Sequence, residues 1–413
     1  MQVAEPASRR NFAGLAWHGT FLAAASALAQ PTTILPAYIV LLGGSPFAVG
    51  LMLTVLLGGS VLPELLFAHV VEGAPKKRPF LIVAVFSRAA AWLALGGVSL
   101  LLDHGGADAL LLLLFLLLAA FSLGGSLGSV AYTDIFGKSI APGLRGRFYA
   151  TRQLFGAFAA LGVIYWAARL LAISGHTRIT YSLLFLAAGG LMLIAGLGFL
   201  ALQEAPQPHV PRPRLAAYLR EMPKLWRLDP GLRALVLVEN IASLHLMLLP
   251  FYMLLAVVRL HVGAQAVATF TMDQVVGGAL SNLLWGWLND RFGSGAVLRT
   301  CLVLGALLPL LALALSAWAP AAYGITFVLL GAAVNSRTLA YNNVLVDLAP
   351  ATLRATYTGL VGTLTAPTLV LPLIGGSLIA ALGYAAVFAG VGLALGASAV
   401  ALWRSPALAA RAR

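Results

Sequence analysis

Charged residues are scarce in this sequence. Only 9% of its 413 residues are Asp, Glu, Lys or Arg, and 61% are hydrophobic. Soluble domains carry about 25% charged residues. So few charges cannot cover the surface of a soluble protein of this length. We therefore expect most of the surface to face lipid, in an all-α integral membrane protein.

Cysteine and catalytic motifs are also nearly absent. The single cysteine, Cys301, excludes an intramolecular disulfide and a cysteine-cluster metal site. The sequence contains no P-loop, so this chain is not expected to hydrolyse ATP. It contains neither H-E-x-x-H nor G-x-S-x-G, which argues against an enzyme. We expect no catalytic residue, no cofactor and no metal.

Acidic residues are half as frequent as basic ones, 13 against 26, and the net charge is +13. In a soluble protein this excess would indicate nucleic-acid binding. Here the basic residues lie in short loops between apolar segments, and 21 of the 26 fall at one predicted side of the membrane. The bias predicts that both termini are cytoplasmic. It also explains the excess charge without a nucleic-acid partner.

Long apolar segments fill the rest of the chain. A bilayer core of about 30 Å requires about 20 apolar residues in a helix. The first apolar segment follows Arg9 and Arg10 and is too long for the hydrophobic region of a cleavable signal peptide. We predict twelve transmembrane helices near 12–42, 47–71, 79–102, 109–135, 148–171, 180–203, 231–259, 265–289, 296–318, 321–346, 355–381 and 384–403.

One long polar stretch, 204–230, is rich in proline and basic residues and separates six segments from six. We interpret it as a cytoplasmic linker between an N-terminal six-helix bundle, 1–203, and a C-terminal six-helix bundle, 231–413.

The two halves repeat short motifs in the same order. Gly286-Trp287-Leu288-Asn289-Asp290-Arg291-Phe292-Gly293 has a degenerate echo at Ala68, Val70 and Glu72, followed by Lys76-Lys77-Arg78. Leu35-Pro36-Ala37-Tyr38 matches Leu249-Pro250-Phe251-Tyr252, and Ala131-Tyr132 matches Ala340-Tyr341. Ala141-Pro142-Gly143-Leu144-Arg145 matches 349–354, which ends in Arg354. The repeats predict two pseudo-symmetric, parallel halves related by an axis along the membrane normal.

With twelve spans, a 6+6 duplication and G-x-L-x-D-R-x-G in a loop between spans, the whole chain resembles the major facilitator superfamily. The resemblance implies alternating access about a central cavity lined by spans 1, 2, 4, 5, 7, 8, 10 and 11. In that family the stronger copy of the loop motif usually lies in the first half, whereas in this chain it lies in the second half.

The repeated loops are candidate gates. We expect Gly286 to permit close helix packing, Asp290 to cap a helix N-terminus, and Arg291 to reach an acid on a neighbouring span. The alternative is a static capping and topology signal. The remaining gating candidates are Asp347 and its first-half counterpart Asp134, together with Glu72, Arg145 and Arg354.

Ionisable residues inside apolar segments are costly, so each is a candidate functional residue. Arg337 lies about 15 Å before Asp347 along its helix, near the predicted midplane. Asn335, Tyr341 and Asn342 lie close to it in sequence. A guanidinium in this setting suits a carboxylate, phosphate or sulfonate of a substrate. The alternative is a buried structural ion pair.

Carboxylates in the spans are candidate proton carriers, because desolvation favours the neutral form. Asp273, beside Gln274, could carry a proton, oppose Arg337 or lie at the external mouth. Glu64 and Glu239 are further candidates. Gln30 precedes Pro31 in a predicted helix bend, where such proteins bind solutes.

The other buried ionisable residues favour structural roles. We expect His18 at the membrane interface, His245 packed in the protein, and Arg88 in a structural pair.

We therefore predict a multi-pass, monomeric secondary transporter of the bacterial inner membrane. It would move a small organic, anionic solute by alternating access with proton coupling, in contact with lipids. One alternative is a proton-antiport exporter of amphipathic compounds. Another is a lipid scramblase or sensor with a transporter fold, since fold alone does not give function.

Overall fold

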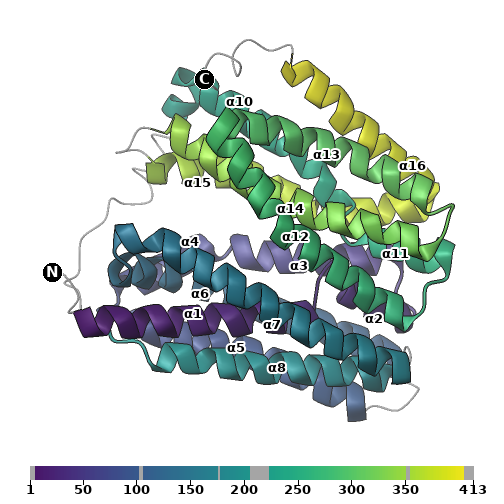
Figure 1. Ribbon diagram of the computed structural model, residues 1–413, viewed down its shortest axis with the longest axis horizontal. Coiled ribbons are helices and arrows are strands. Elements are labelled where there is room, and N and C mark those ends of the chain that lie inside the picture. Colours follow the sequence, from purple (N-terminus) through teal and green to yellow (C-terminus); the bar gives the residue numbers. More distant parts are fainter. Residues whose placement is uncertain (1–4, 102–105, 175–176, 205–222, 350–353, 404–413) are drawn as a thin grey trace. The chain divides into compact units, whose positions relative to one another are not determined.

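The computed structural model describes residues 5–101, 106–174, 177–204, 223–349 and 354–403, and in these residues all regular structure is helical (Figure 1). This confirms the all-helical class. The apolar segments predicted from the sequence become single helices or pairs of helices joined by short breaks.

The helices of the first half follow one another with short connections. They are α1 (Glu5–Leu28), α2 (Ile34–Leu41), α3 (Pro46–Val61), α4 (Glu64–Gly73), α5 (Arg78–Leu101), α6 (Ala107–Ser139), the 3₁₀ helix η1 (Pro142–Leu144), α7 (Arg145–Ser174) and α8 (Arg178–Leu200).

The second half has a similar series of helices. They are α10 (Pro230–Ala242), the 3₁₀ helix η2 (Ser243–Met247), α11 (Phe251–Leu260), α12 (Ala264–Phe292), α13 (Ser294–Leu315), α14 (Pro320–Leu348), α15 (Arg354–Thr365), the 3₁₀ helix η3 (Ala366–Val370) and α16 (Leu371–Trp403).

Proline and glycine explain the breaks inside apolar segments. Pro31 lies between α1 and α2, Pro63 between α3 and α4, and Pro250 between η2 and α11. Proline lacks a backbone N–H and clashes with the preceding turn, so a helix cannot continue through it undisturbed. Within α16, Gly383 adopts a φ of 79°, a left-handed conformation that glycine tolerates and other residues rarely adopt.

Eight helical runs among the described residues are long and apolar enough to cross a membrane, judged by length and composition alone. The last of these, Tyr357–Val400, has 44 residues and is divided at Gly383, so it covers two of the predicted segments. The segments of α1, α12 and α14 are not among the eight, and α12 and α14 carry several polar residues that lower their hydropathy. Twelve spans and cytoplasmic termini therefore remain predictions.

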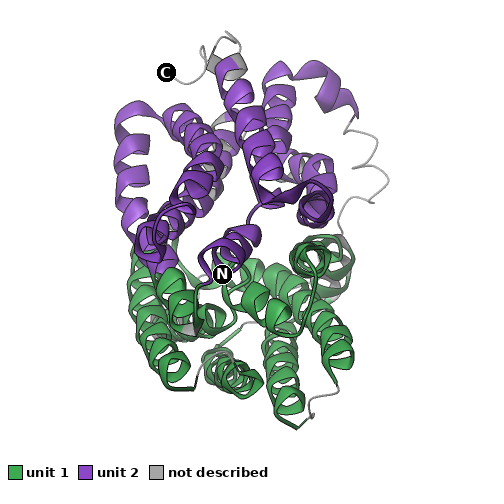
Figure 2. Cartoon of the chain, turned by 90° about the vertical axis from the view of Figure 1, so that its right-hand side faces the viewer, with its two compact units in different colours: residues 1–210, 262–272 green, residues 211–261, 273–413 purple. Residues whose placement is uncertain are grey.

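The chain forms two compact units, coloured separately in Figure 2. Unit 1 comprises residues 1–210 and 262–272, and unit 2 comprises 211–261 and 273–413. Helix α12 contributes its first residues to unit 1 and the remainder to unit 2.

In unit 1, α1 packs against α7 and α8, and α5 packs against α6 and α8. Helices α1 and α8 cross at two glycines: a Cβ on Gly14 would lie 2.6 Å from the carbonyl oxygen of Gly198. Buried aromatic side chains fill the adjoining core, and the hydroxyl of Tyr38 is hydrogen-bonded to Ser99 Oγ at 2.6 Å.

The segment after α8 is fastened to the first helix of unit 1. The fully buried Asn11 donates from Nδ2 to Ser139 Oγ (3.0 Å) and to the Gln203 carbonyl (2.9 Å). Its Oδ1 accepts from the Gln203 N–H at 2.8 Å. Glu204 accepts from the N–H groups of Lys77 (2.8 Å) and Arg78 (2.7 Å) at the start of α5. The bonds between Asn11 and Gln203 join residues that are 192 positions apart in the sequence.

In unit 2, α13 packs against α14 and α16, while α12 crosses α14 at two glycines. A Cβ on Gly277 would press into the carbonyl of Val328, and one on Gly331 would press into the carbonyl of Gln274. Asn335 Nδ2 donates to the Gly278 carbonyl at 2.7 Å across the same crossing. The crossing places α14, which carries Arg337, directly against α12.

Candidate functional site

Arg337 is half-buried on α14 and reaches the junction of α10 and η2. Its Nη2 donates to Ser243 Oγ at 2.6 Å, and Ser243 Oγ in turn donates to the Glu239 carbonyl at 2.7 Å. The serine stands at the point where the α-helix tightens into a 3₁₀ turn. One face of the guanidinium is thus anchored to a helix junction in unit 2.

Tyr341, one turn beyond Arg337 on α14, supports the guanidinium from its ring. Arg337 Cζ lies 5.7 Å from the centroid of the Tyr341 ring, within the range of a cation–π contact. The tyrosine is buried, and its hydroxyl donates to the Val238 carbonyl of α10 at 3.3 Å. The ring is therefore held in place at both ends.

Arg337 nevertheless retains an unmet hydrogen-bonding group. Its Nε is buried without a hydrogen-bond partner, and the described residues place no carboxylate in ion-pair contact with it. Glu239 lies one helical turn before Ser243, and its charge acts on Arg337. The structure shows no hydrogen bond or ion pair between these two described residues. Buried polar groups are normally hydrogen-bonded, so this exception requires an explanation.

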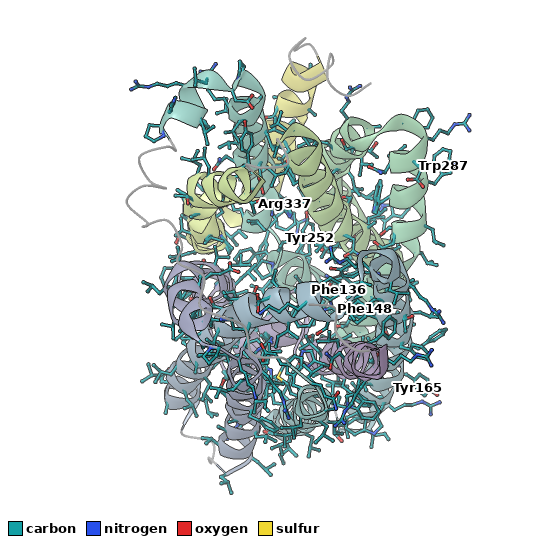
Figure 3. All side chains as sticks on the ribbon, turned by 90° about the vertical axis from the view of Figure 1, so that its left-hand side faces the viewer. Phe136, Phe148, Tyr165, Tyr252, Trp287 and Arg337 are labelled. Atoms are coloured by element: carbon teal, nitrogen blue, oxygen red, sulfur yellow. The ribbon has the colours of Figure 1, made fainter. Side chains whose placement is uncertain are left out.

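Arg337 also lines a small cavity inside unit 2, bounded by residues of α10, η2, α11, α13, α14 and α16. Two of the lining residues, Arg337 and Tyr252, are labelled in Figure 3. The cavity has room for about one water molecule. Apolar side chains form most of the wall, and Cys301, Tyr252 and His245 face the same cavity. His245 Nδ1 is hydrogen-bonded to the Ala242 carbonyl at 2.7 Å, as expected for a packed histidine.

The other predicted solute-binding residues differ in their surroundings. The Asn335 side-chain amide donates a hydrogen bond from α14 to α12, so one of its donors is already used at the helix crossing. Gln274 is buried on α12, and Asp273 is half-buried next to it. Asp273 forms no hydrogen bond or ion pair with the part of the chain that the structure describes, Arg337 included. Gln30 lies in the break after α1, where its carbonyl accepts from the Leu35 N–H at 3.1 Å.

The two remaining candidate proton carriers belong to different units. Glu64 is the first residue of α4 in unit 1 and accepts from Ser129 Oγ of α6 at 3.1 Å. Glu239 is half-buried on α10 in unit 2, beside the Arg337 anchor. Of these carboxylates, Glu239 is the one whose charge acts on the arginine, without a direct hydrogen bond or ion pair.

The gating candidates lie at helix ends. Asp290 and Arg291 are exposed in the last turn of α12, where Arg291 Cζ lies 5.7 Å from the Phe292 ring. Gly286 is exposed, and no described atom lies within 4 Å of the position of a Cβ there. The close packing expected at Gly286 is therefore not found; it occurs at Gly277 and Gly331.

In the first-half loop, Asp134 forms an ion pair with Lys138 one turn later on α6. Arg145, at the start of α7, donates to the carbonyls of Ile140 and Gly137, both at 3.4 Å. The side chains of Glu72, Asn342, Asp347 and Arg354 lie outside the described part of the structure.

Two arginines in unit 1 have surroundings that the sequence did not indicate. Arg152 was not among the sequence candidates, although it falls inside the predicted span 148–171. It lies two turns inside α7, half-buried, with Cζ 5.9 Å from the Tyr132 ring. Arg88 was expected in a structural pair, but it has no ion pair among the described residues and lies over the Phe121 ring at 4.3 Å.

His18 was expected at the membrane interface. It is buried between α1 and α8, stacked on Phe199 with ring centroids 3.8 Å apart, and its depth in the membrane stays a prediction. Its Nδ1 lies 3.3 Å from the Ala195 carbonyl. Close packing of two helices thus decides the position of this histidine.

Comparisons with known proteins agree on the fold. Residues 259–412 match the family model of the Major Facilitator Superfamily. A POT family transporter solved with 5-aminolevulinic acid has a TM-score of 0.75 at 12% identity, covering 97% of this chain and 96% of that one. The nucleoside transporter NupG has a TM-score of 0.65 at 14% identity, covering 96% and 99%.

A third structure, of a bacterial homolog to the human lysosomal transporter Spinster in an inward-facing, unoccupied conformation, has a TM-score of 0.63 at 14% identity. The match covers 99% of this chain and 97% of that one. A search of curated proteins by sequence found no match. The chain thus has the fold of these transporters along nearly its whole length, and its residues 259–412 match the model of the Major Facilitator Superfamily.

Proposed function

We propose that this protein is a secondary transporter that binds a small organic anion at Arg337 and moves it across the membrane by alternating access. The observation that carries the proposal is the state of the guanidinium. Nη2 is anchored on Ser243, the ring of Tyr341 lies beside it, and the buried Nε has no partner.

The energetics favour a ligand role over a purely structural one. An arginine at the centre of a membrane helix costs about 2.5–3.5 kcal/mol on insertion scales. A buried donor without a partner costs about 1–3 kcal/mol more. A carboxylate or phosphate oxygen at Nε would remove the second cost and offset part of the first, because such groups accept two parallel hydrogen bonds from one guanidinium.

The comparisons support transport as the general activity. Each of the three similar structures is described as a transporter or a transporter homolog, and one was solved with an acid bound. The segment that matches the superfamily model contains Arg337, Ser243 lies just before it, and both residues belong to unit 2. An enzymatic activity has no comparable support.

Proton coupling is assigned first to Glu239. Its carboxylate acts on Arg337 electrostatically and is half-buried on the helix that carries Ser243. When Glu239 is ionised it competes with a solute anion for the guanidinium, and when it is protonated it does not. Glu64 and Asp273 remain secondary candidates for the coupling proton.

The experiment is a ligand screen by thermal unfolding of the purified full-length protein. Sugars, amino acids, organic acids, phosphates and amphipathic cations are tested on wild type, Arg337→Ala and Arg337→Lys. Arg169→Ala is the matched control because Arg169 is an exposed arginine of α7 in unit 1. A ligand at 100 times its dissociation constant stabilises by about 2.7 kcal/mol.

We expect one class of small anions to stabilise wild type and the Arg169→Ala control. Loss of a buried charged partner costs about 2 kcal/mol or more, so Arg337→Ala should weaken binding about 30-fold. Arg337→Lys should retain part of the affinity, because lysine keeps the positive charge but cannot donate two parallel hydrogen bonds to one anion. The anion should then drive counterflow in proteoliposomes, with loss of pH dependence in Glu239→Gln.

Equal stabilisation of wild type and Arg337→Ala by the same anions would reject this site. Stabilisation by many unrelated amphiphiles would favour an exporter of such compounds. Lipid movement without solute-dependent transport would favour a scramblase. The bacterial inner membrane and a monomeric state belong to the proposal and are tested by fractionation and by mass measurement in detergent.

A further inference from the structure

We propose that unit 1 contains a second oxyanion-binding site, formed by Arg152 of α7 and the hydroxyl of Tyr132 of α6, with Arg88 of α5 adding positive charge. All of its residues belong to unit 1, whereas Arg337 belongs to unit 2. The inference concerns binding and does not depend on the transport proposal.

The first observation is that both cations lack counter-ions. Arg152 forms no hydrogen bond or ion pair with the described residues. Its guanidinium carbon Cζ lies 5.9 Å from the centroid of the Tyr132 ring. Arg88 likewise forms no hydrogen bond or ion pair with the described residues; its guanidinium lies over the Phe121 ring at 4.3 Å, and its Nε is buried without a partner. Two half-buried guanidinium groups without acids form an electropositive interior.

Three described carboxylates of unit 1 already have other partners. Asp134 pairs with Lys138, Glu204 accepts from the backbone at the start of α5, and Glu64 accepts from Ser129. Neither arginine has an ion pair with any of them in the described ranges. The missing negative charge must therefore come from outside these residues.

The second observation is an unpartnered hydroxyl beside Arg152. The Tyr132 hydroxyl is buried without a hydrogen-bond partner, and so is Ser126 Oγ on the same helix. A buried hydroxyl can donate one hydrogen bond and normally does so. The hydroxyl and the guanidinium together offer donors of the kind that a carboxylate or phosphate oxygen accepts.

The third observation is that glycines make room for both arginines. A Cβ on Gly19 of α1 would lie 2.6 Å from Arg152 Nε, and a Cβ on Gly124 of α6 would lie 3.0 Å from Arg88 Cγ. Without side chains at these positions, each arginine lies directly on a neighbouring helix. The cations are therefore held inside the bundle and not directed away from it.

His18 connects the two arginines. Both guanidinium groups lie close enough to act on it electrostatically, and its ring centroid is 6.5 Å from that of Tyr132. A histidine side chain is neutral or positively charged, so His18, whose Nδ1 faces the Ala195 carbonyl, supplies no negative charge to either arginine. Tyr132 thus lies near both His18 and Arg152, and the charge of Arg88 acts on the same histidine.

The repeated tyrosine gives an internal comparison. Tyr132 and Tyr341 occupy matching positions of the two halves, and each has a guanidinium near its ring, at 5.9 Å and 5.7 Å. In unit 2 the arginine comes from the same helix, whereas in unit 1 it comes from the next helix. The Tyr341 hydroxyl already donates to a carbonyl, but the Tyr132 hydroxyl has no partner and is available to a ligand.

The ligand is a single oxyanion, a carboxylate or a phosphate group. Arg152 lies seven residues into α7 and Tyr132 seven residues before the end of α6, so both lie about 10 Å from a helix end. At that depth the oxyanion can belong to a soluble solute or to the headgroup of an anionic lipid. The experiment therefore includes both sources.

The test uses full-length protein carrying Arg337→Ala, so that the unit 2 arginine cannot contribute. Thermal unfolding is measured in an uncharged detergent against inorganic phosphate, acetate, and chloride at equal ionic strength. A second arm compares phosphatidylglycerol with phosphatidylcholine in mixed micelles. Arg152→Gln and Tyr132→Phe are introduced into this background, with Arg169→Gln as the matched control.

We expect phosphate, acetate or phosphatidylglycerol to raise the unfolding temperature above that in chloride or phosphatidylcholine. Arg152→Gln should weaken this binding about tenfold or more, and Tyr132→Phe about three- to tenfold, as expected for a charged and a neutral hydrogen bond. Arg169→Gln should bind like the background. A response to the lipid alone identifies a headgroup, and a response to the free anions identifies a solute.

Without anion, Arg152→Gln should unfold at a higher temperature than the background, because it removes an unpaired, half-buried charge. If Arg152→Gln does not fold, Tyr132→Phe alone decides the question. The proposal is overturned if no anion or anionic lipid stabilises the background. It is also overturned if the stabilisation is unchanged in both Arg152→Gln and Tyr132→Phe.

Discussion

Replacing Gly331 with alanine should separate two helices of unit 2. The new Cβ would press into the Gln274 carbonyl and lie 2.7 Å from the Gly278 nitrogen, and both obstacles are backbone atoms that cannot rotate away. Overpacking of this kind costs about 1–3 kcal/mol. Moving α12 away from α14 also weakens the bond from Asn335 to the Gly278 carbonyl, which contributes about 1 kcal/mol.

Alanine also has a favourable effect, because glycine within a helix costs about 0.5–1 kcal/mol relative to alanine. The net expectation for Gly331→Ala is therefore a loss of about 2 kcal/mol in the free energy of unfolding. Gly286→Ala provides the control on α12, since it is exposed and no described atom lies within 4 Å of its Cβ position. That variant should gain about 0.5–1 kcal/mol.

Equilibrium unfolding in mixed micelles, followed by circular dichroism, measures both variants against wild type. The two changes are chemically identical, so the difference of about 3 kcal/mol between them isolates the helix crossing. If Gly331→Ala were as stable as Gly286→Ala, α12 and α14 would not meet at these glycines and the reasoning would be wrong.

Three further substitutions test other parts of the fold by the same unfolding measurement. Asn11→Ala removes three hydrogen bonds from a fully buried site and should cost about 2–4 kcal/mol, and Asn11→Asp, which buries a charge and sets a carboxylate oxygen against the Gln203 carbonyl, should cost at least as much. Asp229 caps α10 through the N–H groups of Gly231 (2.8 Å) and Leu232 (3.2 Å) and accepts from Tyr357, so Asp229→Ala should cost about 1–2 kcal/mol and Asp229→Asn less. Tyr38→Phe leaves Ser99 without its 2.6 Å partner and should cost about 1 kcal/mol, and no measurable loss would contradict that bond.

Features that depend on composition and on position along a helix were predictable from the sequence. The scarcity of charge predicted an all-helical membrane protein, and the breaks occur at Pro31, Pro63 and Pro250 because a helix cannot run undisturbed through proline. Length and hydropathy alone give eight spans among the described residues and not twelve. Polar residues in α12 and α14 lower their hydropathy, and one apolar run continues through Gly383.

Features that depend on the rotation of one helix against another were not predictable. Gly286 and Gly331 are both helix glycines, but only the second is in contact with another helix. Arg337 was identified as a buried charge, yet its anchor on Ser243 depends on how α10 tightens into η2. Arg152 was not singled out, because the sequence does not show that its side chain lies beside the Tyr132 ring of another helix.

The bonds between Asn11 and Gln203 have a practical consequence for the gene. They connect residues 192 positions apart, so the beginning and the end of the N-terminal half are already hydrogen-bonded to each other before the linker begins. A coding sequence divided after Glu204 should therefore yield two polypeptides that can be inserted separately and reassociate in the membrane. Co-expression of the two fragments would show whether the covalent linker serves assembly or only guarantees equal numbers of both halves.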